Sequence, residues 1–130
     1  MGDRANFGFK QMGGTVFLYA HWGGYQMMNT LANAIKVVMD NGREDDPVYA
    51  TRIAISHIIG DEWASPYGYG ISVNTITDNE HSIPIVDWTQ GNVSLYTQGL
   101  DTIKFTMPLG VFVQKFLKEV DAKPLTYTRV

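Results

Sequence analysis

The stretch YAHWGGY at residues 19–25 lies where an extended pattern stops and a helical pattern begins. Before it, side chains alternate as they do in a strand, and Phe17, Tyr19 and His21 share one face. After the Gly-Gly pair, apolar residues recur at helical spacing from 28 to 39. The sequence therefore predicts a strand, a glycine turn and a helix in immediate succession.

Three helices are expected from capping and stop signals. The first ends at Gly42, because glycine readily adopts the left-handed conformation that closes a helix. The second begins near Asp46, which can cap it, has Pro47 in its first turn and ends at Gly60. The third begins around residues 106–108 and carries a narrow apolar stripe toward residue 120.

Alternating residues between turn signals predict the strands. In chain order the expected strands and turns are residues 7–11, the turn Met12-Gly13-Gly14, residues 15–22, residues 69–76, residues 83–88, the turn Gln90-Gly91-Asn92 and residues 93–97. The five polar residues from 77 to 81 form a connection outside the core. Pro84 indicates that its strand has an unpaired edge or that Pro84 lies at the strand's start.

The expected order is ββααβββα with an extended tail at 121–130. Hairpins favour antiparallel pairing, and helices on a sheet face then give one layered α+β domain over residues 1–130. The alternating tail is expected to add a strand or to dock on a neighbouring subunit. Together with the strand near Pro84, it predicts a possible homo-oligomer.

Composition narrows the classes of function. The chain has 130 residues and 45% hydrophobic content, enough to fill one core. It has no cysteine, which excludes disulfides, thiolate metal sites and a cysteine nucleophile. The formal net charge is −3, and Lys and Arg are scattered along the sequence. The chain therefore lacks the basic patch that typically binds duplex nucleic acid. With no secretory pattern and no long apolar run, no membrane partner is expected, and a cytoplasmic location is predicted.

The glycine turn is a candidate anion site. A strand that feeds such a turn and a helix leaves backbone N–H groups unpaired, and Gly23 and Gly24 are expected to present these groups to a ligand phosphate. A simple turn is an equally good interpretation, because a full phosphate loop also contains a Lys-Ser/Thr pair that is missing here.

Aromatic residues around the turn are the candidate stacking groups. Trp22 and Tyr25 are expected to stack on a base or ring, and His21 and Tyr19 are expected to supply hydrogen bonds. Tyr69, in the strand that follows a Gly-rich loop, is included in this predicted site. The alternative is that these rings are satisfied core aromatics at a strand end.

Charged residues elsewhere complete the predicted site. Arg4 and Arg52 are candidates for neutralising phosphate, and Arg52 stands out because it lies inside an otherwise apolar helix. Asp78 and Glu80 are candidates for accepting hydrogen bonds from ribose hydroxyl or base amino groups. The alternative for Asp78 and Glu80 is a turn whose side chains bond their own backbone.

The sequence pattern assigns no residue a catalytic role. If the protein is an enzyme, His21 with Asp78 or Glu80 is the candidate acid/base pair. No serine lies in a Gly-x-Ser-x-Gly turn, and the histidines form no compact ligand motif, so no metal and no cofactor are expected. His57, among isoleucines, is expected to be structural.

Several short motifs resemble a group of small uncharacterised bacterial and phage proteins. They are GDRAN at residues 2–6, Y-x-HWGG at 19–24 and DNE at 78–80. The resemblance implies a bacterial or phage origin, and it implies no mechanism because the group has no established activity.

The leading hypothesis from the sequence is a small-molecule binding protein. Its expected ligand is a nucleotide or a nucleotide-derived signal, which a phage protein would sequester from a host. The alternatives are a hydrolase of a phosphorylated or glycosidic small molecule and a protein that inhibits a host factor by direct interaction.

Overall fold

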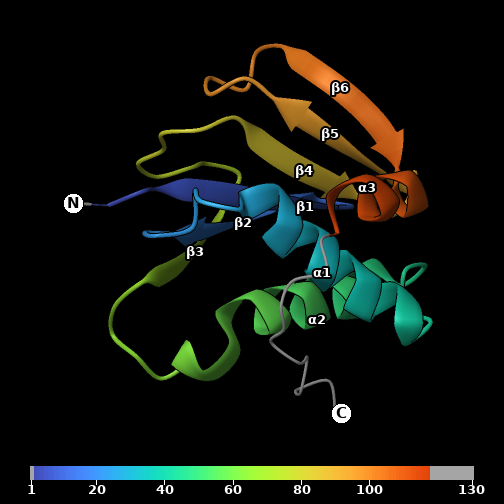
Figure 1. The fold of residues 1–130 in the computed structure, drawn as a ribbon, viewed down its shortest axis with the longest axis horizontal. Coiled ribbons are helices and arrows are strands. Elements are labelled where there is room, and N and C mark those ends of the chain that lie inside the picture. Colours follow the sequence, from blue (N-terminus) through green and yellow to red (C-terminus); the bar gives the residue numbers. More distant parts are fainter. Residues whose placement is uncertain (1, 118–130) are drawn as a thin grey trace.

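The computed structural model describes residues 2–117 and contains one six-stranded sheet with helices packed against it (Figure 1). The elements in chain order are β1 (Ala5–Gln11), β2 (Gly14–Ala20), α1 (Met27–Asp40), α2 (Pro47–Ile59), the short 3-10 helix η1 (Gly60–Glu62), β3 (Tyr69–Val73), β4 (Ile83–Asp87), β5 (Asn92–Tyr96), β6 (Ile103–Pro108) and α3 (Leu109–Phe116). The predicted α+β class is confirmed, and the predicted helices and strands occur in the predicted order, with one further strand, β6, before α3.

The strands lie in the order β3-β2-β1-β4-β5-β6. Neighbours pair antiparallel except β1 and β4, which pair parallel with Gly8 opposite Ile85. Hairpins join β1 to β2 and β4 to β5 at the two turns that the sequence predicts, and Gly91 in the second turn has a φ of 70°. The sheet is therefore mostly antiparallel.

Local signals set the bounds of the first two helices. The carboxylate of Asp46 accepts a hydrogen bond from the Tyr49 N–H and Pro47 occupies the first turn of α2, as predicted. Gly42 and Gly60 follow the two helices with φ of 68° and 61°, which favour glycine. These stop signals were also predicted.

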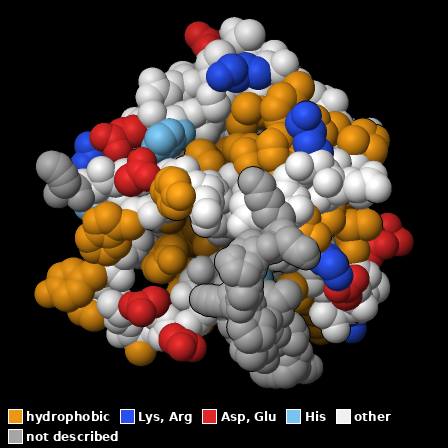
Figure 2. All heavy atoms as spheres, viewed as in Figure 1, with side chains coloured by type: hydrophobic (Ala, Val, Ile, Leu, Met, Phe, Trp, Pro, Cys, Tyr) orange, Lys and Arg blue, Asp and Glu red, His pale blue; other side chains and the backbone are white. Residues whose placement is uncertain are grey.

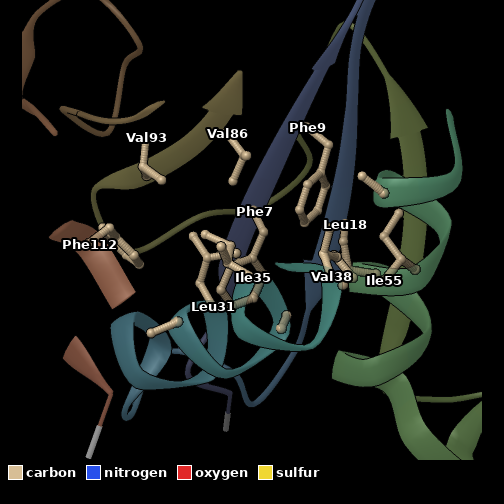
Figure 3. Packing of buried hydrophobic residues seen from close by; sticks show 14 of the residues in the cluster. Phe7, Phe9, Leu18, Leu31, Ile35, Val38, Ile55, Val86, Val93 and Phe112 are labelled. Carbon is tan, nitrogen blue, oxygen red and sulfur yellow. The ribbon is translucent and has the colours of Figure 1, made fainter. Parts of the chain in front are cut away.

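One face of the sheet carries the core. Phe7 and Leu18 are opposite each other on β1 and β2, as are Val86 and Val93 on β4 and β5, and all four are fully buried. Figure 3 shows these side chains pointing toward residues of α1, α2 and α3. The contacts that α1 makes with both other helices complete this layer.

The link from β3 to β4, residues 74–82, crosses the other face of the sheet, because β2 and β1 lie between those strands. The buried side chain of Asn6 in β1 anchors the link. Its amide Nδ2 lies 3.3 Å from the carbonyl of Thr77, 3.1 Å from that of Asp78 and 3.2 Å from Oδ1 of Asn79. This crossing brings the polar residues of the link to the start of β1.

The structure adds a strand and refines three other expectations. Residues 106–108, expected to open the third helix, end β6 instead, and α3 begins at Leu109. The strand expected over 69–76 ends at Val73. Pro84 lies at the start of β4, an interior strand, which agrees with the second of its two interpretations. The predicted tail lies outside the described residues.

Within residues 2–117, none of the helices has both the length and the apolar content that a membrane span requires.

Candidate functional site

Seven side chains from three segments converge beside the start of β1. We call them the polar cluster, and they are Asp3, Arg4, Tyr19, His21, Asp78, Glu80 and His81. They come from the chain before β1, the end of β2 and the link over the second face. The structure thus brings together five residues that the sequence analysis placed in the site.

Backbone hydrogen bonds hold these segments in register. The Asp3 N–H donates to the His21 carbonyl over 2.8 Å, and the Gly24 N–H donates to the Asp3 carbonyl over 2.9 Å. Arg4 and Glu80 are linked twice, because the Glu80 N–H donates to the Arg4 carbonyl and the Arg4 N–H donates to Glu80 Oε1. The side chains of the cluster therefore project from a fixed main chain.

The shortest contact between side chains from different segments joins His81 and Asp3. Nε2 of His81 lies 2.7 Å from Oδ1 of Asp3, so the imidazole donates to the carboxylate. Gly24 passes directly beside this pair, since a Cβ added at Gly24 would lie 2.1 Å from that Nε2 and 2.3 Å from that Oδ1. A side chain at position 24 would therefore displace the tips of His81 and Asp3 from their contact.

A second pair joins Tyr19 and His21, as their shared strand face predicts. The Tyr19 hydroxyl lies 2.6 Å from His21 Nδ1, and the ring of Trp22 meets that of His21 edge to face with centroids 4.6 Å apart. Burial is the main cause that raises the pKa of Tyr19. Asp78 and Glu80 add to this rise in pKa, whereas the guanidinium of Arg4 opposes it.

The cluster has more negative than positive charge. Arg4 Nε lies 3.9 Å from Asp78 Oδ2, and Arg4 Nη2 lies 3.4 Å from Glu80 Oε2. Asp3 is a third carboxylate, and Arg4 is the guanidinium that faces them. A group that donates hydrogen bonds or carries positive charge therefore fits this cluster better than a phosphate does.

Three cluster residues also have the geometry of metal ligands. One ligand atom each from Asp3, Glu80 and His81 lies within 4.8 Å of the other two. One nitrogen and two oxygen ligands suit several divalent metals. No compact sequence motif indicates this group, because Asp3 lies 78 positions before His81 in the chain.

A chain of amides supports the histidine of this group. Asn6 contacts Oδ1 of Asn79, and the Asn79 side-chain amide donates to the carbonyl of His81. The fully buried Asn6 thereby connects the core strand β1 to the position of His81. Such supporting hydrogen bonds limit how far a functional side chain can move.

The glycine turn does not offer the free amides that were expected. The Gly23 N–H donates to the Ala20 carbonyl over 3.2 Å, and the Gly24 N–H donates to the Asp3 carbonyl. An anion would have to displace these intramolecular hydrogen bonds. Gly24 contributes to the site by its lack of a side chain, and Gly23 lies against Ala20, where a Cβ would be 2.5 Å from that of Ala20.

Arg52 lies apart from the cluster. It is exposed on α2, next to Thr51, whose hydroxyl accepts a hydrogen bond from Gln11 Nε2 over 2.7 Å. Gln11 ends β1, whereas the cluster lies before that strand begins. The partner expected for Arg52 is not found among the described residues, and its exposure to solvent explains why none is needed.

The predicted aromatic residues are accessible. Trp22 is 62% exposed and Tyr25 is 77% exposed, so neither is a core aromatic. Figure 2 shows hydrophobic side chains gathered on the left of the molecule, below a group of acidic and histidine side chains. The exposed ring of Trp22 therefore lies next to the imidazole of His21.

Tyr69 lines a different feature, a hollow of about 190 Å³ between the end of α2 and β3. Its lining residues are Ile59, Glu62, Trp63, Ser65, Tyr69, Gly70 and Ile71. Burial raises the pKa of Tyr69, and the negative charge of Glu62 adds to this rise.

The sequence analysis missed Asp3 and His81 in the cluster and Trp63 in the hollow. The only feature of the sequence that could have indicated these three residues is their residue type within polar or Gly-rich segments.

Comparisons of this chain with family models, with curated proteins and with solved structures give no match.

Proposed function

We propose that this protein binds a small molecule that combines a ring with hydrogen-bond donors, as a nucleoside or nucleotide does. The observation that supports this proposal is the excess of carboxylate and imidazole groups in the polar cluster beside the exposed rings of Trp22 and Tyr25. Asp3, Asp78 and Glu80 would accept hydrogen bonds from hydroxyl or amino groups.

The exposed rings would supply stacking energy. Trp22 is held edge to face against His21, which fixes one side of the indole while the rest stays accessible. A stacked ring contributes on the order of 1 kcal/mol beyond the burial of its surface. Tyr25 follows the hydrogen-bonded Gly24 and would contact the opposite side of a ligand or its edge.

The charge of the cluster favours recognition of the base and sugar over recognition of phosphate. Arg4 is already paired with two carboxylates, and the amides of the glycine turn are occupied. A phosphate would point into solvent and add little affinity. Sequestration of a nucleotide-derived signal, action in the cytoplasm of a host and a phage origin are parts of this proposal.

Calorimetry and thermal shift with nucleosides and with mono-, di- and cyclic nucleotides test the proposal. We expect nucleosides to bind about as well as their phosphorylated forms, and we expect the Trp22→Ala substitution to weaken binding about tenfold or more. Trp63→Ala is the matched control, because Trp63 is also an exposed tryptophan but lies outside the cluster.

Repeating the titrations with EDTA shows whether an adventitious divalent ion takes part. The proposal fails if no member of the panel stabilises the protein. It also fails if Trp22→Ala and Trp63→Ala change binding equally.

A hydrolase is the second candidate, and the His81–Asp3 pair is the observation that favours it. An imidazole oriented by a carboxylate can move a proton at its other nitrogen. His21 is less available, because Tyr19 occupies its Nδ1 and Gly2 lies against its Nε2. The geometry thus favours His81 with Asp3 over the pair that the sequence predicted, His21 with Asp78 or Glu80.

Product analysis separates the two functions. A bound ligand that is recovered chemically unchanged supports binding alone. Turnover that is lost in both His81→Gln and Asp3→Asn but kept in His21→Gln supports hydrolysis by the His81–Asp3 pair.

A further inference from the structure

Within residues 2–117, β3 is an edge strand of the sheet, and its own sequence and pairing lack the usual features that prevent pairing with another chain. Its sequence YGISV contains no charge and no proline, and its ladder with β2 is regular. The opposite edge differs, because β6 carries Lys104 and Pro108 and its pairing with β5 is irregular. Charges, prolines and bulges are the features that keep edge strands from pairing with other chains. Only β6 has them.

The apolar side chains of β3 point to the helix side of the sheet but are not covered by a helix. Tyr69, Ile71 and Val73 pair with Ala20, Leu18 and Val16, which belong to or pack against the core. Yet Tyr69 is 38%, Ile71 is 53% and Val73 is 62% exposed. A contiguous exposed apolar strip of this kind is typical of an interaction surface.

A stripe of α2 forms the other side of this surface. Val48, Arg52, Ile55 and Ile59 recur at spacings of four, three and four residues, so they share one side of the helix. Val48 and Arg52 are exposed, whereas Ile55 and Ile59 are buried and belong to the core. Ile59 meets Tyr69 and Ile71 in the hollow, which fixes the direction in which this stripe points. Val48 is among the exposed large apolar residues. We call β3, together with the exposed Val48 and Arg52 of this stripe, the edge surface.

The edge surface has opposite charges at its two ends. Glu62 lines the hollow beside Tyr69, at the start of β3. Arg52 lies toward the other end of β3, because its neighbour Thr51 is bonded to Gln11, at the end of β1 near the start of β2. A two-fold axis between two copies of the chain would place the Arg52 end of one copy beside the Glu62 end of the other.

We propose that the edge surface binds a second copy of this chain, with the two β3 strands pairing antiparallel about Ile71. In this arrangement Tyr69 of each copy lies opposite Val73 of the other, and the free backbone groups of both edges are satisfied. Each Arg52 approaches the other copy's Glu62, and no charged side chain of β3 opposes the pairing. The charge complementarity and the self-complementary strand favour a second copy over an unrelated partner.

Sedimentation velocity of the full chain over a concentration series tests this inference. We expect a concentration-dependent dimer, and we expect Ile71→Lys to raise its dissociation constant at least about tenfold, because the axis brings the two lysines together. Ile103→Lys is the matched control. Ile103 is 50% exposed on the opposite edge strand, so its substitution should leave dimerisation unchanged.

A charge exchange tests the arrangement independently of strand substitutions. Arg52→Glu and Glu62→Arg should each weaken the dimer, and the double variant should restore it. Circular dichroism identifies any variant that fails to fold. The proposal is overturned by a monomer at every concentration, by a dimer that tolerates Ile71→Lys, or by single charge variants that the double variant does not rescue.

Discussion

Gly24 occupies the most restricted position of the polar cluster. Its backbone N–H holds Asp3, and its missing side chain leaves room for the contact between His81 and Asp3. The sequence identified a functional glycine here and assigned it the wrong physical role. The residue leaves space for the side chains of His81 and Asp3, and its amide is already bonded.

Replacing Gly24 with alanine tests this role. The added Cβ would overlap the ends of the His81 and Asp3 side chains and break their hydrogen bond, so we expect the free energy of unfolding to fall by about 0.5–1.5 kcal/mol. Gly13→Ala is the control, because a Cβ at Gly13 meets no atom within 4 Å. Urea unfolding measures both variants. Equal stability of the two would contradict the packing that is described here.

Asn6 gives a second prediction at the scale of one residue. Asn6→Ala removes contacts to two carbonyls and to Asn79, and we expect a loss of about 1–3 kcal/mol in unfolding free energy. Amide hydrogen exchange in residues 77–81 should accelerate at the same time. Asn92→Ala in β5 is the control strand substitution, and it should leave that exchange unchanged.

Helices and hairpins follow the local sequence closely. The cap at Asp46, the stops at Gly42 and Gly60 and the turn at Gly91 all lie where their residues predict. The strand β6 is the exception. Its alternating residues lead directly into the apolar helix α3. The sequence pattern therefore predicts a helix that already begins at residues 106–108, which belong to β6.

His57 in α2 provides a pH-dependent test of helix packing. Burial lowers the pKa of His57 from its ordinary 6.5, so the unfolded chain takes up this proton before the folded chain does. Its contribution to stability is therefore complete above about pH 6.5 and is lost as the pH falls toward the lower folded value.

We expect unfolding free energy to decrease more steeply below pH 6.5 in the native chain than in His57→Gln. For one proton the difference in slope is at most about 1.4 kcal/mol per pH unit. Urea unfolding between about pH 5 and pH 8 measures both curves. Parallel curves would show that His57 is not protected from protonation by the fold.

For the whole molecule, the polar cluster and the edge surface use different parts of the sheet. The cluster lies beside the start of β1 and includes residues of the link between β3 and β4. The edge surface lies on β3 and α2. The residues that carry the two surfaces do not overlap, although Trp22 lies near Gly68, the residue that precedes β3.

We expect their substitutions to act independently. Ile71→Lys should leave the thermal shift by a bound nucleoside unchanged, and His81→Gln should leave the dissociation constant of the dimer unchanged. Sedimentation and thermal shift on the same two variants check this expectation. A loss of ligand binding in Ile71→Lys would show that dimerisation and binding are coupled.

The sequence by itself determined the α+β class, most helix and strand positions and five of the seven residues in the polar cluster. These features depend on neighbours in the chain, such as caps, turn glycines and alternation. The partners within the cluster were decided by the tertiary structure, since Asp3 and His81 are 78 positions apart. The order of the strands in the sheet explains other features that the sequence did not predict. It places β3 at an edge and sends residues 74–82 across the second face, and no local pattern encodes that order. The packing of α2 near the end of β1 separates Arg52 from the cluster.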